Sequence, residues 1–156
     1  MARSLTLTDS TIQVLTTAEA KQHLRVANSA DDSYIDNLIF AATKMAESYC
    51  NIQIMKTSCV QIADCWEDTF ELYQSPVQNS GEISVESIKY YDGDNVLQTW
   101  AVTNYIVDNS YTPARIGIAP DKTYPTITRR LNSIEIKYGS GYENSNEVPK
   151  LLKQAI

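Results

Sequence analysis

Residues 15–26 read LTTAEAKQHLRV and residues 31–50 read DDSYIDNLIFAATKMAESYC, and these two amphipathic segments decide the fold expected for this chain. Thr16 and Glu19 have the Ser/Thr-x-x-Glu spacing of a capping box, in which two side chains satisfy the first backbone amides of a helix. A helix is therefore expected to begin there, with Ala20 and Leu24 as a narrow apolar stripe.

The second segment predicts a longer helix. Asp31 and Asp32 would lie in its first turn, where carboxylates favour the positive end of the helix dipole, and Ser29 would cap it. Apolar residues then follow helical spacing over about five turns: Ile35, Leu38, Ile39, Ala42, Met45, Ala46 and Tyr49. This spacing predicts one buried face, so Leu38→Asp should unfold the helical hairpin by burying an unpaired charge.

After residue 53 the apolar period changes to two, which is typical of strands. The expected strands cover residues 58–63, 70–72, 83–90, 105–107, 115–118 and 133–138, with a hairpin turn at 91–96. Near the end of the chain, Pro149 stands where the first turn of a helix tolerates proline. We therefore expect one α+β domain over residues 1–156: a helical hairpin at 15–50, a mostly antiparallel β region at 53–138 and a short helix at 148–156.

Composition and charge narrow the function classes. The chain has 156 residues, 43% of them hydrophobic and 21% charged, with a formal net charge of −6. This composition is typical of a globular domain. The negative charge opposes tight binding to the phosphate backbones of nucleic acids. Three cysteines without a paired framework, and no Asn-x-Ser/Thr site, predict a reducing compartment. The N-terminus lacks the apolar run of a signal peptide, and no stretch approaches the length of a membrane span.

Four acidic residues around Trp66 are the strongest candidate for chemistry: Asp64, Glu67, Asp68 and Glu71. Paired carboxylates can act as acid and base in hydrolysis or bind a hard cation. A solvated loop between strands explains them better, because no positioned His, Lys or Ser accompanies the cluster.

Other motifs have structural explanations. Asp92-Gly93-Asp94-Asn95 begins like a calcium loop, but Thr103 occupies the twelfth position, where Glu is needed, and a hairpin turn fits better. Gly139-Ser140-Gly141 follows a strand, yet Asn144 stands where a dinucleotide fingerprint needs its third glycine. The doublet Arg129-Arg130 is interpreted as a loop or partner contact.

The positions of histidine and cysteine in the sequence give little support for metal binding or thiol chemistry. His23 is the single histidine, and no Cys-x2-Cys spacing is present, so zinc is not expected. A Cys–His nucleophilic pair is not excluded by spacing, although Cys50 and Cys59 are expected to be buried structural thiols. We predict no catalytic, metal or cofactor site.

The order of these motifs resembles the tailed-bacteriophage head-to-tail connector (adaptor) family. The opening run matches through Ala20-Lys21 and Leu24-Arg25-Val26. Later landmarks follow in order: Asp31-Asp32, Ile35, Leu38-Ile39, Ala41-Ala42, Glu47, Tyr49, Val85 to Asp92, Tyr105, Tyr124-Pro125, Gly141-Tyr142 and Val148-Pro149.

This resemblance implies a structural protein that is not an enzyme. Such a protein forms a ring, dodecameric by this resemblance, beneath the portal in the neck of a virion assembled in the host bacterial cytoplasm. It offers a platform to a stopper or tail-completion protein, and DNA passes non-specifically through its lumen. The net negative charge of the chain agrees with this role, because a negatively charged ring would let DNA slide through it. No cofactor and no membrane are implied.

The resemblance also suggests contact residues. The C-terminal segment of the family commonly reaches the portal, which points to Val148, Pro149, Leu151, Leu152 and Ile156. A ring needs two different patches on each subunit, and we expect the exposed side of the 31–50 helix and the sheet edges to supply them. Lys21 and Arg25, one helical turn apart, could pair with acids of a neighbour such as Glu47; a solvated helix face is the alternative.

Two other functions stay open at this point. One is a monomeric intracellular α+β module that binds a protein partner through a sheet edge. The other is a hydrolase that uses the four acidic residues around Trp66.

Overall fold

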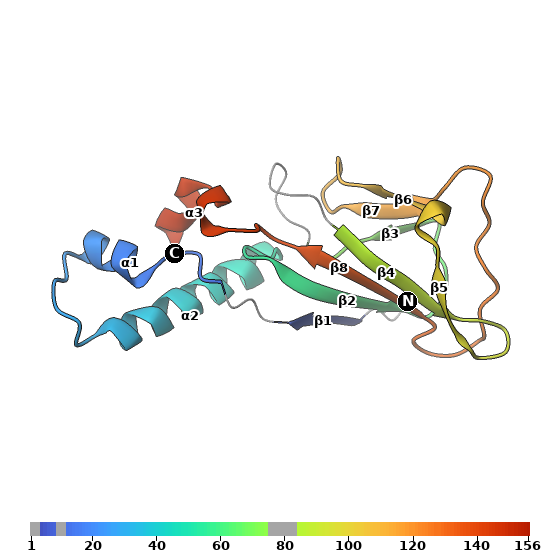
Figure 1. Ribbon diagram of the computed structural model, residues 1–156, viewed down its shortest axis with the longest axis horizontal. Coiled ribbons are helices and arrows are strands. Elements are labelled where there is room, and N and C mark those ends of the chain that lie inside the picture. Colours follow the sequence, from blue (N-terminus) through green and yellow to red (C-terminus); the bar gives the residue numbers. More distant parts are fainter. Residues whose placement is uncertain (1–3, 9–11, 75–83) are drawn as a thin grey trace.

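The helices gather at one end of the fold and the strands at the other (Figure 1). The computed structural model describes residues 4–8, 12–74 and 84–156. The helices are α1 (Thr17–Leu24), α2 (Asp32–Cys50) and α3 (Lys150–Ala155), with 3-10 turns at Val102–Asn104 and Ser145–Glu147. The strands are β1 (Ser4–Thr8), β2 (Thr57–Ala63), β3 (Thr69–Glu71), β4 (Ser84–Tyr91), β5 (Leu97–Trp100), β6 (Tyr105–Asp108), β7 (Arg115–Ile118) and β8 (Ile134–Ser140). The predicted α+β class is confirmed.

The predicted capping box at the start of α1 is confirmed. The Glu19 N–H donates to Thr16 Oγ1 at 3.2 Å, and the Thr16 N–H donates to Glu19 Oε2 at 2.8 Å. Arg25 ends the helix in the left-handed conformation, with φ of 58°. No residue of α1 is buried, and Leu24 is 57% exposed. The capping box therefore marks the start of the helix as predicted, while the apolar stripe of the helix is not buried.

The start of α2 was predicted correctly, but its cap was not. Asp31 occupies the N-cap position without a side-chain hydrogen bond. Ser29 contributes only its carbonyl, which accepts from the Asp32 N–H at 3.4 Å. The Asn28 carboxamide oxygen instead accepts from the Ala30 N–H at 3.1 Å, so the turn before α2 is organised one residue earlier than expected.

The prediction that one face of α2 is buried is only half correct. The buried residues form a row at every fourth position: Ile35, Ile39, Thr43 and Glu47. Leu38, Met45 and Tyr49, predicted to be buried, are 48%, 76% and 91% exposed. The apolar arc of α2 is wider than the surface that α1, α3 and the adjoining segments cover, so part of it faces solvent.

Two antiparallel sheets form the other end of the molecule. One has the strand order β1-β2-β8-β4-β5 and the other the order β3-β7-β6. Strands β1 and β5 were not predicted; both are sheet edges, where neighbours cover only one side. The expected hairpin turn joins β4 to β5, and Asp92 Oδ1 accepts from the N–H groups of Asp94 and Val96 at 3.1 and 2.9 Å.

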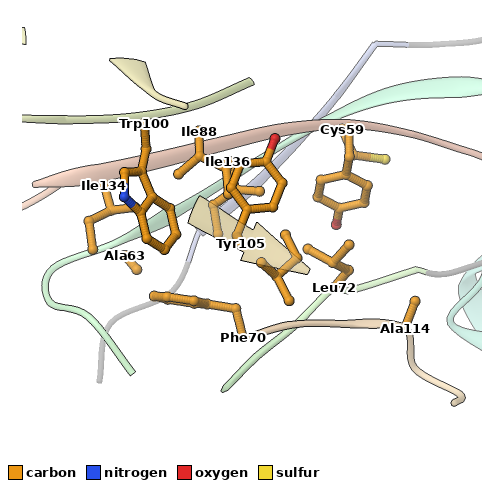
Figure 2. Close-up of a cluster of buried hydrophobic side chains, with 12 residues drawn as sticks. Cys59, Ala63, Phe70, Leu72, Ile88, Trp100, Tyr105, Ala114, Ile134 and Ile136 are labelled. Atoms are coloured by element: carbon orange, nitrogen blue, oxygen red, sulfur yellow. The ribbon is translucent and has the colours of Figure 1, made fainter. Parts of the chain in front are cut away.

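Buried side chains from both sheets form the main core (Figure 2). Trp66 extends this core, stacking on Tyr124 at 5.1 Å between ring centroids and lying 4.9 Å from Trp100. Its indole N–H donates to the Pro125 carbonyl at 2.9 Å, which satisfies the polar end of a largely apolar side chain. The core therefore joins the second sheet and the long 119–133 connection to the first.

A second cluster lies where the helices meet the sheet. Its buried members are Val14, Ile54, Met55, Tyr142 and Val148. Ala46 of α2, Leu152 of α3 and Ile156, which follows α3, pack against it. None of the described helices is long and apolar enough to cross a membrane.

Candidate functional site

The C-terminal segment divides into docking and exposed residues. Val148 is 3% exposed and belongs to the second cluster, against which Leu152 and Ile156 also pack. Pro149 is exposed, and Leu151 is 81% exposed. Of the five residues predicted to contact the portal, three hold α3 on its own chain. Only Pro149 and Leu151 present much of their surface to another molecule.

Polar contacts link α3 to the start of α1. Lys153 Nζ lies 3.6 Å from Glu19 Oε1. The hydrogen bond from the Thr16 N–H, followed by that from the Thr16 hydroxyl, lowers the pKa of Glu19, and Lys153 adds a smaller effect in the same direction. The carboxylate that caps α1 therefore also faces α3, so the two short helices share one charged contact.

Lys21, Arg25 and Glu47 are not brought together by the fold. Lys21 Nζ pairs with Asp32 Oδ1 at 2.6 Å, which ties α1 to the first turn of α2. Arg25 lies exposed at the end of α1. Thr17 Oγ1 adds a hydrogen bond to Asp36, so two polar contacts join α1 to the first turns of α2.

Glu47 was expected to be accessible to Lys21 or Arg25 of a neighbour and is instead 5% exposed. Its Oε1 accepts from the Ile54 N–H at 3.0 Å, and its Oε2 lies 3.1 Å from Lys44 Nζ. Ile54 is fully buried, so its N–H needs an acceptor within the protein, and Glu47 supplies one. The burial of Glu47 therefore has a structural cause, and the contact of Lys21 and Arg25 with a neighbour stays a prediction.

The acidic residues around Trp66 are spread over a loop and a strand. Asp64 Oδ1 accepts from the Asn132 N–H at 2.7 Å. Asp68 offers its backbone carbonyl to the Tyr124 hydroxyl at 3.2 Å, and the carbonyl of Glu71 accepts from Gln61 Nε2 at 2.9 Å. Within residues 4–8, 12–74 and 84–156, no three His, Cys, Asp or Glu side chains are grouped to hold a metal ion. The contacts observed here are those of a structural loop.

The thiols differ in exposure. Cys59 is fully buried in the main core, and burial raises its pKa to about 12, so the thiolate is scarce at neutral pH. Cys50 and Cys65 are exposed. The expectation that Cys50 is buried is wrong, because the last turn of α2 extends beyond the elements that cover its earlier part. His23 is exposed in the last turn of α1.

The glycine and arginine motifs have structural contacts. Gly141 has φ of +99°, and a Cβ there would lie 2.5 Å from the Met55 carbonyl oxygen. The Ser140 hydroxyl donates to the Gln74 carbonyl at 2.6 Å. Arg130 lies in a loop, and its guanidinium carbon is 3.9 Å from the centroid of the Tyr91 ring. Gly141 thus permits a close backbone approach, which accounts for the glycine without a phosphate ligand.

Sequence reasoning missed an exposed apolar surface on the helical end. A groove between the three helices is lined mainly by apolar side chains, among them Ala20, Leu24, Leu38, Ala42 and Ile156. The residues of α2 predicted to be buried but found exposed continue this surface. Comparing the wide apolar arc of α2 with the short stripe of α1 could have revealed it, since eight residues of α1 are too few to cover that arc.

Apolar side chains exposed together on the helical end of an α+β fold are typical of a surface that contacts another molecule. The chain belongs to the phage gp6-like head-tail connector family, whose model matches residues 15–112. This is a family of structural connector proteins and not of enzymes. No curated protein matches the chain.

Two solved structures share the fold over nearly the whole chain. One is described as the neck of an empty gene transfer agent (GTA) particle computed with C6 symmetry; it has a TM-score of 0.74 at 20% identity, covering 96% of this chain and 78% of that one. The other is the virion of a native gene transfer agent particle, with a TM-score of 0.72 at 19% identity, covering 95% and 78%. At this identity the likeness establishes a common fold.

Proposed function

We propose that this chain forms a ring beneath the portal in the neck of a phage or phage-like particle, and that the ring offers a platform to a stopper or tail-completion protein. The observation that carries the proposal is the family match over residues 15–112. The similarity in fold to chains of gene transfer agent particles supports it. Assembly would take place in the cytoplasm of the host.

Charge supports passage of DNA through such a ring. The formal net charge of −6 opposes retention of a polyanion on the ring, because binding of phosphates needs clustered Lys and Arg. DNA would then pass without a specific contact.

The exposed part of the C-terminal helix is our candidate for the portal contact. Leu151 is 81% exposed, and Pro149 lies exposed just before α3. Val148, Leu152 and Ile156 would act indirectly, because their packing holds α3 against the second cluster. A large apolar side chain that projects from a docked helix is suited to enter a pocket or groove on a partner.

Co-sedimentation with portal rings from the same genome tests this function. The unmodified chain should sediment with the portal, and electron microscopy of the fraction should show ring on ring. Leu151→Asp should abolish co-sedimentation. Leu131→Asp is a matched control, because Leu131 is 73% exposed in a loop at the sheet end, and it should bind normally.

Each alternative result has a distinct meaning. If the unmodified chain fails to bind, the adaptor function is overturned, and a monomeric protein-binding module becomes the better explanation. If the chain binds but Leu151→Asp binds equally well, the adaptor function stands and the portal contact lies elsewhere.

A further inference from the structure

Helix α2 carries a row of large apolar side chains that its own chain does not cover. These are Tyr34, Leu38, Met45 and Tyr49, here called the α2 stripe, and they are 64%, 48%, 76% and 91% exposed. At 100° per residue the four positions lie within an arc of about 60°. The stripe therefore forms one continuous face along most of the helix.

Charged residues are absent from the α2 stripe. The helix carries its charges on other faces: Asp32, Asp36, Lys44 and Glu47. Interface cores are depleted in charge and enriched in Tyr and Met. The composition of the stripe is thus that of the centre of a protein interface.

The size of the α2 stripe fits part of a stable interface. The two tyrosines, the methionine and the leucine expose on the order of 500 Å² together, given their exposed fractions and the surface of such side chains. A standard interface buries about 800 Å² on each partner. The stripe would supply the apolar centre of such a contact, with polar neighbours completing it.

The opposite flank of α2 presents a second, different apolar face. Phe40 is 52% exposed and Ile12 is 46% exposed, and both line a shallow hollow beside α2. Lys44 Nζ lies 5.8 Å from the Phe40 ring centroid. Phe40 is roughly 150° around the helix from the centre of the α2 stripe. We call Ile12, Phe40 and Lys44 the α2 flank.

We propose that the α2 stripe of one copy docks on the α2 flank of the next copy. This inference rests on the proposed ring. A closed ring requires two different complementary faces on every subunit, pointing away from each other. The α2 stripe and Phe40 lie on one helix, and these apolar side chains are about half or more exposed, whereas a partner of another kind would use only one of the two faces. In Figure 1, α1 and α3 are both drawn on the upper side of α2.

Cross-linking between chains that each carry one exposed cysteine tests the pairing. The exposed thiols are first removed with Cys50→Ser and Cys65→Ser, while the buried Cys59 is kept. Chains carrying Tyr34→Cys, Met45→Cys or Tyr49→Cys are mixed in equal amounts with chains carrying Ile12→Cys or Phe40→Cys. The mixtures are treated with a short bismaleimide, both on portal rings and at high concentration without portal.

We expect mixed dimers of the two chain types, and no dimer from any single variant alone. Dimers from Met45→Cys alone would overturn the pairing, because two stripes would then meet around a two-fold axis. Cross-links to the portal protein but not between copies would overturn it in favour of the portal as occupant.

Failure of this inference is distinguishable from failure of the proposed function. If the unmodified chain sits in several copies on the portal but no mixture yields a mixed dimer, the docking surface is wrong and the function stands. If the chain does not bind the portal, mixed dimers at high concentration would still support the surface, and their absence there would overturn it.

A pair of charge substitutions provides a second measurement. Met45→Asp combined with Tyr49→Asp should reduce multimer formation at least about tenfold, which corresponds to 1.4 kcal/mol. The melting temperature should stay near that of the unmodified chain, because both side chains are largely exposed. Leu131→Asp should assemble normally. Normal assembly of the double variant would overturn the inference.

Discussion

At the scale of single residues, burial decides what a side chain can do. Glu47 was a candidate acid for pairing with Lys21 or Arg25 of a neighbour, yet its carboxylate accepts a hydrogen bond from the buried Ile54 N–H. Leu151 and Val148 belong to one short segment, but one is 81% and the other 3% exposed. A role in binding a partner can therefore be assigned only after the fold has shown which atoms are free to contact it.

Gly141 is the residue whose replacement should have the clearest effect on stability. Gly141→Ala would place a Cβ 2.5 Å from the Met55 carbonyl oxygen at φ of +99°. We expect a loss of at least about 2 kcal/mol in the free energy of unfolding, measured by chemical denaturation. The strain should also weaken the backbone hydrogen bonds of Tyr142 with Ile54 and Lys56, which join the C-terminal segment to the start of β2.

Gly93→Ala is the matched control. A Cβ at Gly93 would meet nothing within 4 Å, and the backbone there does not have a positive φ. Its free energy of unfolding should change by less than about 0.5 kcal/mol. Equal effects of the two substitutions would show that close approach at Gly141 does not limit stability.

At the scale of elements, the apolar periodicity of α2 predicted its secondary structure correctly but its burial only in part. Apolar spacing correctly predicted a helix and the burial of Ile35 and Ile39. It could not tell which part of the apolar arc would be covered. That depends on the length and position of α1 and α3, and both are short: α1 has eight residues and α3 has six.

Leu38→Asp and Ile39→Asp are adjacent substitutions with opposite expected results. Leu38 is 48% exposed, so an aspartate there can remain hydrated and should cost at most about 1 kcal/mol. Ile39 is 6% exposed, so an aspartate there is buried without a partner and should cost at least about 3 kcal/mol. Thermal unfolding followed by circular dichroism would measure both.

This prediction replaces the one drawn from the sequence, in which Leu38→Asp unfolded the helical hairpin. Loss of the cooperative transition in Leu38→Asp would mean that the groove between the helices is closed in solution. Tolerance of Ile39→Asp would contradict the burial of the Ile35, Ile39 and Thr43 row.

At the scale of the whole molecule, stability should be unequal between the two ends. Strand β8 pairs with β2 on one side and β4 on the other, and its side chains lie in the main core. Helix α1 buries no residue and is held by a capping box and polar contacts. Local opening costs least where few apolar contacts are broken.

Hydrogen exchange should reveal this gradient. In the free chain, amides of α1 should exchange at least about 100-fold faster than those in the middle of β8. Assembly on the portal should slow exchange in α2 and α3 more than in β8, which is already protected. Equal protection of α1 and β8 in the free chain would contradict the gradient.

What the sequence by itself determined were the local features: the capping box, the helix of residues 32–50, most strands, the β4–β5 turn and the family. The structural features depend on residues close together in the chain, whose spacing carries the signal, and the family resemblance depends on the order of such motifs along the chain. Only the tertiary structure decided that Glu47 is buried, that α2 exposes Leu38, Met45 and Tyr49, and that Val148 docks α3. Burial depends on which distant segments pack against a face, and spacing along one helix does not contain that information.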